Sequence, residues 1–115
     1  MITIYHNPRC RKSREGLAVL EESGKAFQVV HYLNEALTKD DVTRLLRYLD
    51  LPPMALIRTN EPIWKQEFKG RELSDEALVD AMLKYPKLIE RPIVVKDQKA
   101  VIGRPAENIL ELLHH

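Results

Sequence analysis

The sequence contains very little cysteine. Cys10 is the single cysteine among 115 residues. One cysteine cannot form an internal disulfide, which excludes a secreted scaffold stapled by such bridges. Structural zinc sites are commonly rich in paired thiolate ligands, and such pairs are missing as well. Any chemistry at Cys10 is therefore that of a lone thiol, and a reducing cytoplasm is the expected location.

The sequence also lacks an excess of one charge and any long apolar run. It has 18 basic and 17 acidic residues, a formal net charge of +1. Nucleic-acid-binding domains usually have a strong basic excess, so we expect no nucleic-acid partner. No stretch approaches the roughly 18 consecutive apolar residues of a membrane span. The N-terminal residues lack the pattern of a signal peptide, and we expect no membrane partner.

The length fits one domain, which we expect to span residues 1–115. Hydrophobic residues make up 44% of the chain, enough for a core without disulfides or metals. There is no internal repeat and no low-complexity linker. The terminal residues His114 and His115 belong either to the native chain or to a purification tag, and we assign them no role.

Local patterns predict strands and helices along the whole chain. Strands are expected over residues 2–5, 27–33, 93–95 and 100–102, and helices over residues 13–22, 75–85 and 106–113. A further helix is expected after Thr38, with Val42, Leu45, Leu46 and Leu49 at helical spacing and Pro52-Pro53 ending it, followed by shorter helical pieces over 54–69. Thr38 and Asp41 have the spacing of a capping box, with Asp in place of the usual Glu. Pro105 is expected in the first turn of the last helix. The first strand–helix–strand unit implies a parallel pair of strands, and residues 97–99 predict a hairpin turn.

Cys10 lies in a cationic run with Arg9, Arg11, Lys12 and Arg14. A thiol becomes a nucleophile as its thiolate, which nearby cations and a helix N-terminus both favour. The predicted strand-to-helix turn is also a place where backbone N–H groups hold anions. The alternative is that Cys10 is a small buried hydrophobe and the cations are a solvated surface cluster.

Three further arginines lie near the ends of predicted elements: Arg58, Arg91 and Arg104. Arginine is always charged and offers a planar fork of donors suited to oxyanions. Together with the cysteine loop they predict an anion pocket, although each alone is compatible with a surface position. A cis bond at Arg91–Pro92 would present Arg91 at the start of a strand.

His6 and Ser13 flank the cysteine in sequence. His6 is either structural, or it approaches the thiol and supports the thiolate as an imidazolium or in proton transfer. Ser13 either caps the helix or donates a hydrogen bond to the sulfur. Because the loop reads Cys-x-x-Ser, any disulfide must form with another molecule.

Five segments together resemble the arsenate reductase family of the glutaredoxin-coupled, thioredoxin-like type. They are residues 4–10, 13–14, 56–58, 90–95 and 102–105, and the resemblance extends over residues 2–113. It implies an α/β fold: a thioredoxin-like, mixed four-stranded sheet flanked by helices, with a central helical insertion at about residues 38–86. It also implies a structural cis-proline at Pro92.

The resemblance assigns roles to individual residues. Cys10 is the implied nucleophile, and His6 matches a histidine that helps to lower the cysteine pKa. Arg58, Arg91 and Arg104 match the catalytic arginines that hold the oxyanion. The residues expected to contact the substrate are Cys10, Arg11, Lys12, Ser13, Arg14, Arg58, Arg91 and Arg104.

The resemblance also implies a reaction. The Cys10 thiolate attacks arsenate, water leaves, glutathione attacks the adduct, and glutaredoxin reduces the mixed disulfide as arsenite is released. Glutathione is thus an expected co-substrate, with no bound cofactor and no metal. The expected partners are arsenate or a similar oxyanion, glutathione and glutaredoxin, and we expect a monomer.

Two other functions remain open at this point. One is a redox-responsive transcription regulator that binds RNA polymerase, a related branch that commonly carries Cys-x-x-Cys. The other is a glutathione-linked reductase of protein mixed disulfides, which needs no oxyanion pocket. Charged residues around Cys10 and an end soon after the last helix make the chain similar to a shorter branch of the family.

Overall fold

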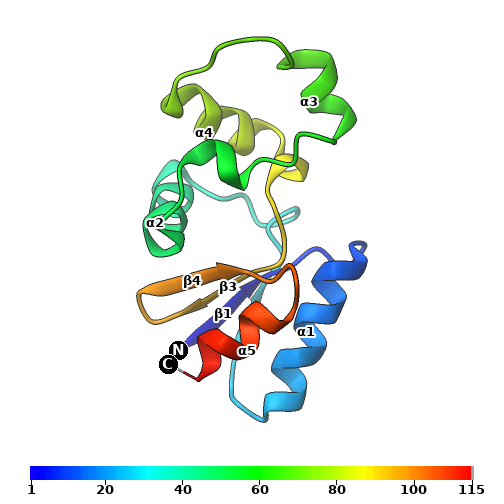
Figure 1. Cartoon of the computed structure of the whole chain (residues 1–115), viewed down its shortest axis with the longest axis vertical. Coiled ribbons are helices and arrows are strands. Elements are labelled where there is room, and N and C mark those ends of the chain that lie inside the picture. Colours follow the sequence, from blue (N-terminus) through cyan, green and yellow to red (C-terminus); the bar gives the residue numbers. More distant parts are fainter. Residues whose placement is uncertain (115) are drawn as a thin grey trace. The chain divides into compact units, whose positions relative to one another are not determined.

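The computed structural model describes residues 1–114, so the expectation for His115 lies outside the described residues. The chain forms two compact units (Figure 1). The first combines residues 1–35 with the chain from Arg91 onward, and the second is Ala36–Glu90. That the whole chain acts as one domain with an insertion over residues 38–86 stays a prediction.

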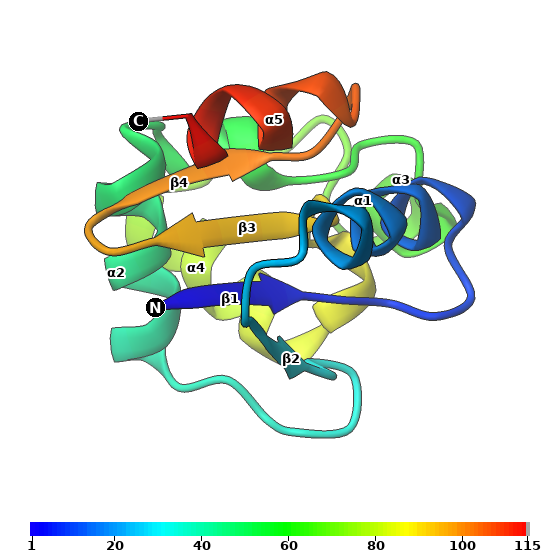
Figure 2. The same ribbon diagram turned by 90° about the horizontal axis from the view of Figure 1, so that it is seen from below.

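The first unit is built on a mixed four-stranded sheet, as predicted. Its strands are β1 (Ile2–Tyr5), β2 (Gln28–Val30), β3 (Ile93–Lys96) and β4 (Lys99–Ile102). They lie in the order β2-β1-β3-β4, which Figure 2 shows face on. Strand β1 is parallel to β2 and antiparallel to β3, and β3 is antiparallel to β4.

The second strand is shorter than the predicted range of residues 27–33. After Val30 the chain turns, because the N–H of His31 donates to the Glu35 carboxylate at 2.8 Å. The carbonyl of His31 in turn accepts from the N–H groups of Asn34 and Glu35. These bonds use the backbone groups that a longer strand would have paired with β1.

Two helices complete the first unit, α1 (Arg11–Ser23) and α5 (Glu107–Leu113). Helix α1 begins two residues earlier than predicted and ends at Gly24, whose φ of 73° suits glycine. Helix α5 begins after its N-cap residue Ala106, so Pro105 precedes the helix and does not occupy its first turn. The Arg91–Pro92 and Arg104–Pro105 bonds are both cis.

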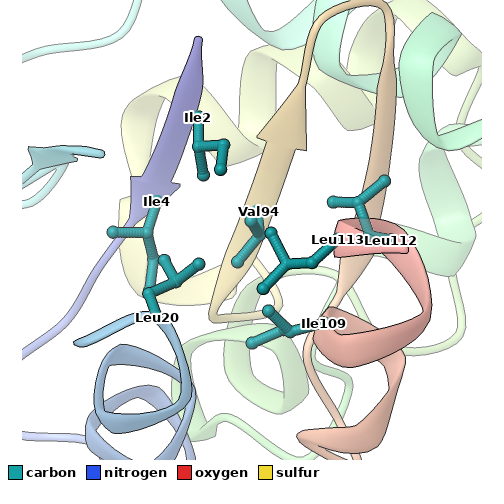
Figure 3. Packing of buried hydrophobic residues seen from close by; sticks show 7 residues of the cluster. All are labelled: Ile2, Ile4, Leu20, Val94, Ile109, Leu112 and Leu113. Carbon is teal, nitrogen blue, oxygen red and sulfur yellow. The ribbon is translucent and has the colours of Figure 1, made fainter. Parts of the chain in front are cut away.

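The core of the first unit lies between one face of the sheet and these two helices. Alternation in β1 directs Ile2 and Ile4 to this face, where they meet Leu20 of α1 and Ile109 of α5 (Figure 3). Burying each such side chain contributes about 1.5–3 kcal/mol. The buried cluster consists of Ile2, Ile4, Leu20, Val94, Ile109, Leu112 and Leu113.

The second unit is helical. It contains α2 (Lys39–Leu49), α3 (Pro62–Glu67) and α4 (Asp75–Lys84), with 3-10 turns η1 (Pro53–Leu56) and η2 (Pro86–Leu88). An isolated antiparallel bridge joins Ile57 to Ile89. The bridge pairs the residue after η1 with the residue after η2, so it ties the middle of this unit to its C-terminal end.

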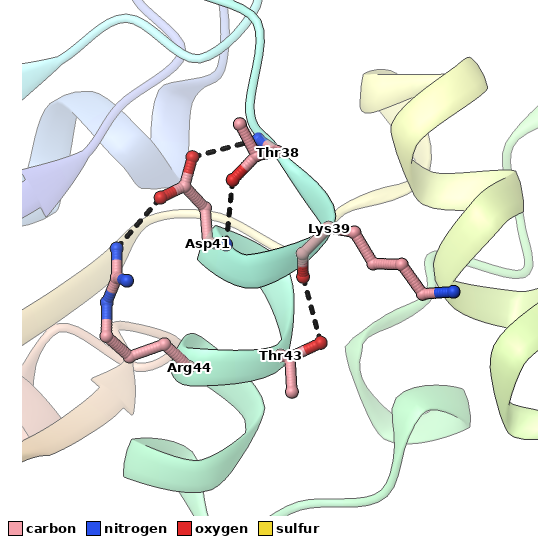
Figure 4. A network of polar contacts seen from close by, with 5 residues as sticks. All are labelled: Thr38, Lys39, Asp41, Thr43 and Arg44. Carbon is pink, nitrogen blue, oxygen red and sulfur yellow. Dashed lines mark hydrogen bonds and ion pairs between the residues drawn. The ribbon is translucent and has the colours of Figure 1, made fainter.

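Helix α2 begins with the predicted capping box (Figure 4). The Thr38 hydroxyl accepts from the Asp41 N–H at 3.1 Å, and the Asp41 carboxylate accepts from the Thr38 N–H at 2.8 Å. Arg44 donates to the same carboxylate at 2.8 Å. The Thr38 N–H, with help from the Thr38 hydroxyl and Arg44, outweighs burial and lowers the pKa of Asp41. Aspartate therefore serves in the place of the usual glutamate.

Across residues 1–114, no helix has both the length and the apolar character needed to cross a lipid bilayer.

Candidate active site

Cys10 occupies the N-cap position of α1. Its backbone is extended, with φ −97° and ψ 122°, and its side chain is half-buried. The loop before it is closed by the Cys10 N–H, which donates to the Asn7 carbonyl at 3.0 Å. The side chain at an N-cap faces the first unpaired N–H groups of the helix. The strand-to-helix turn predicted from sequence therefore brings the sulfur to a helix N-terminus.

The surroundings of the sulfur favour the thiolate. Burial raises the pKa of the Cys10 thiol, but hydrogen bonds from the Ser13 backbone N–H, the Arg91 side chain and the Lys12 backbone N–H lower it, as does the Arg91 charge. The net pKa lies below the ordinary value of a thiol. A half-buried thiol with these partners does not fit the alternative of a small hydrophobe in an apolar core.

Arg91 reaches the sulfur through the pairing of β1 with β3. Tyr5, the last residue of β1, pairs with Ile93, the first residue of β3. The residues that follow β1 therefore lie beside those that precede β3, which brings Arg91 to Cys10. The Arg91 side chain is buried, with 7% of the residue exposed.

Two glycines, Gly16 in α1 and Gly103 directly after β4, allow close packing around Pro92 and Ile109. A Cβ on Gly16 would lie 2.7 Å from Pro92 Cγ and 3.0 Å from Ile109 Cδ1. A Cβ on Gly103 would meet the same two side chains at 3.0 and 2.7 Å. The Gly103 N–H also donates to the Pro92 carbonyl at 2.8 Å. Sequence reasoning missed these positions, although a glycine inside a helix is unfavourable by about 1 kcal/mol and so points to a close approach.

His6 and Ser13 form a buried pair behind the cysteine loop. His6 is 3% exposed and Ser13 is fully buried. Ser13 Oγ lies 2.7 Å from His6 Nδ1 and accepts from the Asn7 N–H at 3.0 Å. The arrangement that satisfies every group has the Ser13 hydroxyl donating to Nδ1, which leaves the proton of a neutral imidazole on Nε2.

This pair corrects two expectations. Burial, followed by the nearby charges of His31 and Arg14, lowers the pKa of His6, and hydrogen bonding to Ser13 opposes this only in part. At neutral pH the ring is neutral, so the imidazolium role is not supported. The Ser13 hydroxyl neither caps α1 nor bonds to the sulfur, because it is turned toward His6 and Asn7.

Three cationic side chains of the run contact groups other than the sulfur. Arg14 Nη1 donates to the Pro8 carbonyl at 3.0 Å and so holds the loop. Arg11 Nε and Lys12 Nζ lie 3.4 and 3.6 Å from the Glu15 carboxylate. The run therefore favours the thiolate mainly through its backbone N–H groups. The expectation from sequence did not distinguish these N–H groups from the charged side chains.

The remaining two predicted arginines lie elsewhere. Arg104 is half-buried in the first unit, between β4 and α5, and its carbonyl lies 3.5 Å from Asn108 Nδ2. Arg58 belongs to the second unit, where its Nε is 4.0 Å from carboxylate oxygens of both Glu61 and Glu90. The first unit thus gathers Cys10, His6, Ser13 and Arg91, while the proposed roles of Arg58 and Arg104 stay predictions.

Comparison with known proteins shows the family of the chain. The model of the ArsC family matches residues 5–112. The chain belongs to the ArsC family. An uncharacterised protein of Escherichia coli, YfgD, is 45% identical over 97% of this chain and 96% of its own length. An arsenate reductase of the same organism is 39% identical over 97% of this chain and 80% of its own length.

The fold of the chain is also similar to that of a solved structure. An arsenate reductase from Vibrio cholerae superposes with a TM-score of 0.91 at 47% identity, covering 96% of this chain and 95% of that chain. The likeness confirms the predicted fold class, a thioredoxin-like mixed sheet flanked by helices. The ArsC-family membership predicted from the sequence motifs is confirmed as well.

Proposed function

We propose that this ArsC-family protein reduces arsenate to arsenite with Cys10 as the nucleophile. The observation that carries the proposal is the half-buried Cys10 thiol at the N-terminus of α1, whose pKa the Ser13 and Lys12 N–H groups and Arg91 lower. A group of donors that stabilises a thiolate also suits an oxyanion beside it. The arsenate reductases among its relatives support the choice of substrate.

In the proposed first step the Cys10 thiolate attacks the arsenic atom of arsenate. A sulfur–arsenic bond forms, and one oxygen leaves as water after taking up protons. Negative charge on the remaining oxygens is neutralised by Arg91 and by the first N–H groups of α1. Arg104 is proposed as a second donor in the same unit, on the strength of the family resemblance.

The next steps need thiols from outside the chain, because Cys10 is its single cysteine. A glutathione thiolate attacks the Cys10 sulfur, the electron pair of the sulfur–arsenic bond stays on arsenic, and arsenite leaves. A second glutathione, with glutaredoxin as the proposed catalyst, then reduces the mixed disulfide and restores Cys10. In total two thiols become one disulfide while arsenate loses one oxygen as water.

The decisive experiment follows the oxidation of NADPH with arsenate, glutathione, glutaredoxin and glutathione reductase. The protein is expected to give arsenate-dependent oxidation, and Cys10→Ser is expected to abolish it. Far-UV circular dichroism of the variant provides the control for folding. Absence of arsenate-dependent turnover in a protein whose Cys10 still reacts with iodoacetamide would overturn the proposal.

The same reagents distinguish the other enzymatic possibility. Replacing arsenate with a glutathionylated protein tests for a reductase of protein mixed disulfides, which needs a thiolate but no oxyanion. If that substrate is turned over and arsenate is not, the function is reassigned to thiol–disulfide exchange.

A further inference from the structure

The exposed cations beside Cys10, three of which the resemblance assigns to substrate contact, have no part in the reaction steps proposed above. Arg9, Arg11, Lys12 and Arg14 are all exposed, and we call these four residues the cationic rim. No acidic residue lies in the first turn of α1, Arg11–Ser23. The rim therefore places exposed positive charge on both sides of Cys10 in the chain, to which the helix N-terminus adds.

The rim has little negative charge of its own to balance it. Arg11 and Lys12 share one carboxylate, that of Glu15, at 3.4 and 3.6 Å. The Arg11 side chain is 83% exposed and the Lys12 side chain 49%. Ion pairs that are so exposed are weak and readily exchange one carboxylate for another. An anionic molecule at the thiol can therefore recruit both side chains from Glu15.

We propose that the cationic rim selects the external thiol that attacks the Cys10 sulfur, favouring small thiols that carry carboxylate groups. The carboxylates would pair with Arg11 and Lys12 in place of Glu15, while the thiolate approaches the sulfur at the helix N-terminus. The proposal rests on the proposed function only in that an external thiol must restore Cys10. Charge complementarity next to the reacting atom is what favours this occupant.

The test uses the Cys10 mixed disulfide with 5-thio-2-nitrobenzoate and needs no arsenate. Each thiol attacks the Cys10 sulfur, a new disulfide to Cys10 forms, and nitrobenzoate thiolate leaves with the electron pair and is read by its colour. The thiols are mercaptosuccinate with two carboxylates, neutral 2-mercaptoethanol and cationic cysteamine. Each rate is divided by that of the same thiol with the nitrobenzoate disulfide of a blocked cysteine, which removes differences in intrinsic reactivity.

The expected order is mercaptosuccinate, then 2-mercaptoethanol, then cysteamine. The ratio of the first two rates is expected to fall about three- to tenfold in the Arg11→Gln, Lys12→Gln double variant, the range that two exposed ion pairs can supply. Added salt is expected to lower the ratio in the same direction. Lys25→Gln removes a cation just beyond the other end of α1 and is expected to leave the ratio unchanged.

Glu15→Gln gives a second, opposite expectation. Removing the carboxylate that Arg11 and Lys12 share leaves both cations in place, so the ratio is expected to rise. Equal normalised rates for the three thiols, or a ratio that neither the double variant nor Glu15→Gln alters, would overturn the proposal. Because these rates are measured without arsenate, failure here is distinguishable from failure of arsenate reduction.

Discussion

Replacing Gly16 with alanine tests whether close packing of α1 holds the thiol site together. A Cβ at this position would lie 2.7 Å from Pro92 Cγ, whereas carbon atoms in contact prefer about 3.5–4.0 Å. Helix and proline must therefore separate by roughly 1 Å. Overpacking of this kind costs about 1–3 kcal/mol. Alanine stabilises a helix by about 1 kcal/mol relative to glycine, so the free energy of unfolding is expected to fall by a net amount of about 0–2 kcal/mol.

The two contributions are separated by a matched variant and by two assays. Ala18→Gly changes an exposed position of the same helix and measures the helix contribution alone, with an expected loss of about 1 kcal/mol in urea unfolding. Gly16→Ala is also expected to move Cys10 away from Arg91, which raises the thiol pKa and shifts alkylation by iodoacetamide to higher pH. Stabilisation by about 1 kcal/mol together with an unchanged pH profile would refute the reasoning.

Three further predictions concern single contacts. Arg91→Gln removes the charged donor at the sulfur and is expected to raise the pKa of Cys10, shifting iodoacetamide labelling toward alkaline pH; an unchanged profile would remove Arg91 from the site. Folding lowers the pKa of His6, so below about pH 6.5 the unfolded chain binds a proton that the folded chain does not, and the free energy of unfolding falls. In urea unfolding at several pH values, His6→Gln is expected to lose less of this free energy on acidification than the wild type. Equal pH dependence in the two proteins would contradict a neutral His6 ring. Thr38→Ala removes half of the capping box and is expected to cost about 1 kcal/mol, a fall in melting temperature of roughly 4 °C, and an unchanged temperature would argue against the cap.

Features that depend on neighbouring residues could be predicted from sequence. The β-branched run Ile2–Tyr5 forms the expected strand. The hairpin turn predicted over residues 97–99 is present but one residue shorter, because Lys99 already pairs with Lys96 in β4. The capping box at Thr38 and Asp41 involves only four consecutive residues, so their spacing is sufficient to predict it. These patterns carry their own geometry and need no tertiary information.

Features that depend on contacts between residues distant in the chain could not be predicted from the sequence. The role of Ser13 was misjudged because the helix begins at Arg11 and not at Ser13, which moves Ser13 from the cap to the third helical position. Its hydroxyl then faces His6, whose burial no local pattern indicates. The approach of Arg91 to Cys10 depends on the register of β1 with β3. The sequence indicates an anion pocket that includes Arg91, but no local pattern fixes that register.

The pairing of Tyr5 with Ile93 has a consequence for folding as well as for reactivity. Since the guanidinium meets the sulfur only when β1 and β3 are paired, unfolding returns the thiol to its ordinary acidity. Ionised sulfur therefore favours the native state, a contribution that is present in full above the unfolded thiol pKa of about 8.5 and lost as pH falls through the lower native value. Protein whose Cys10 is carbamidomethylated has no thiolate, so its free energy of unfolding should not gain this contribution in alkaline solution. Alkylation of one sulfur atom therefore reports on the pairing of β1 with β3.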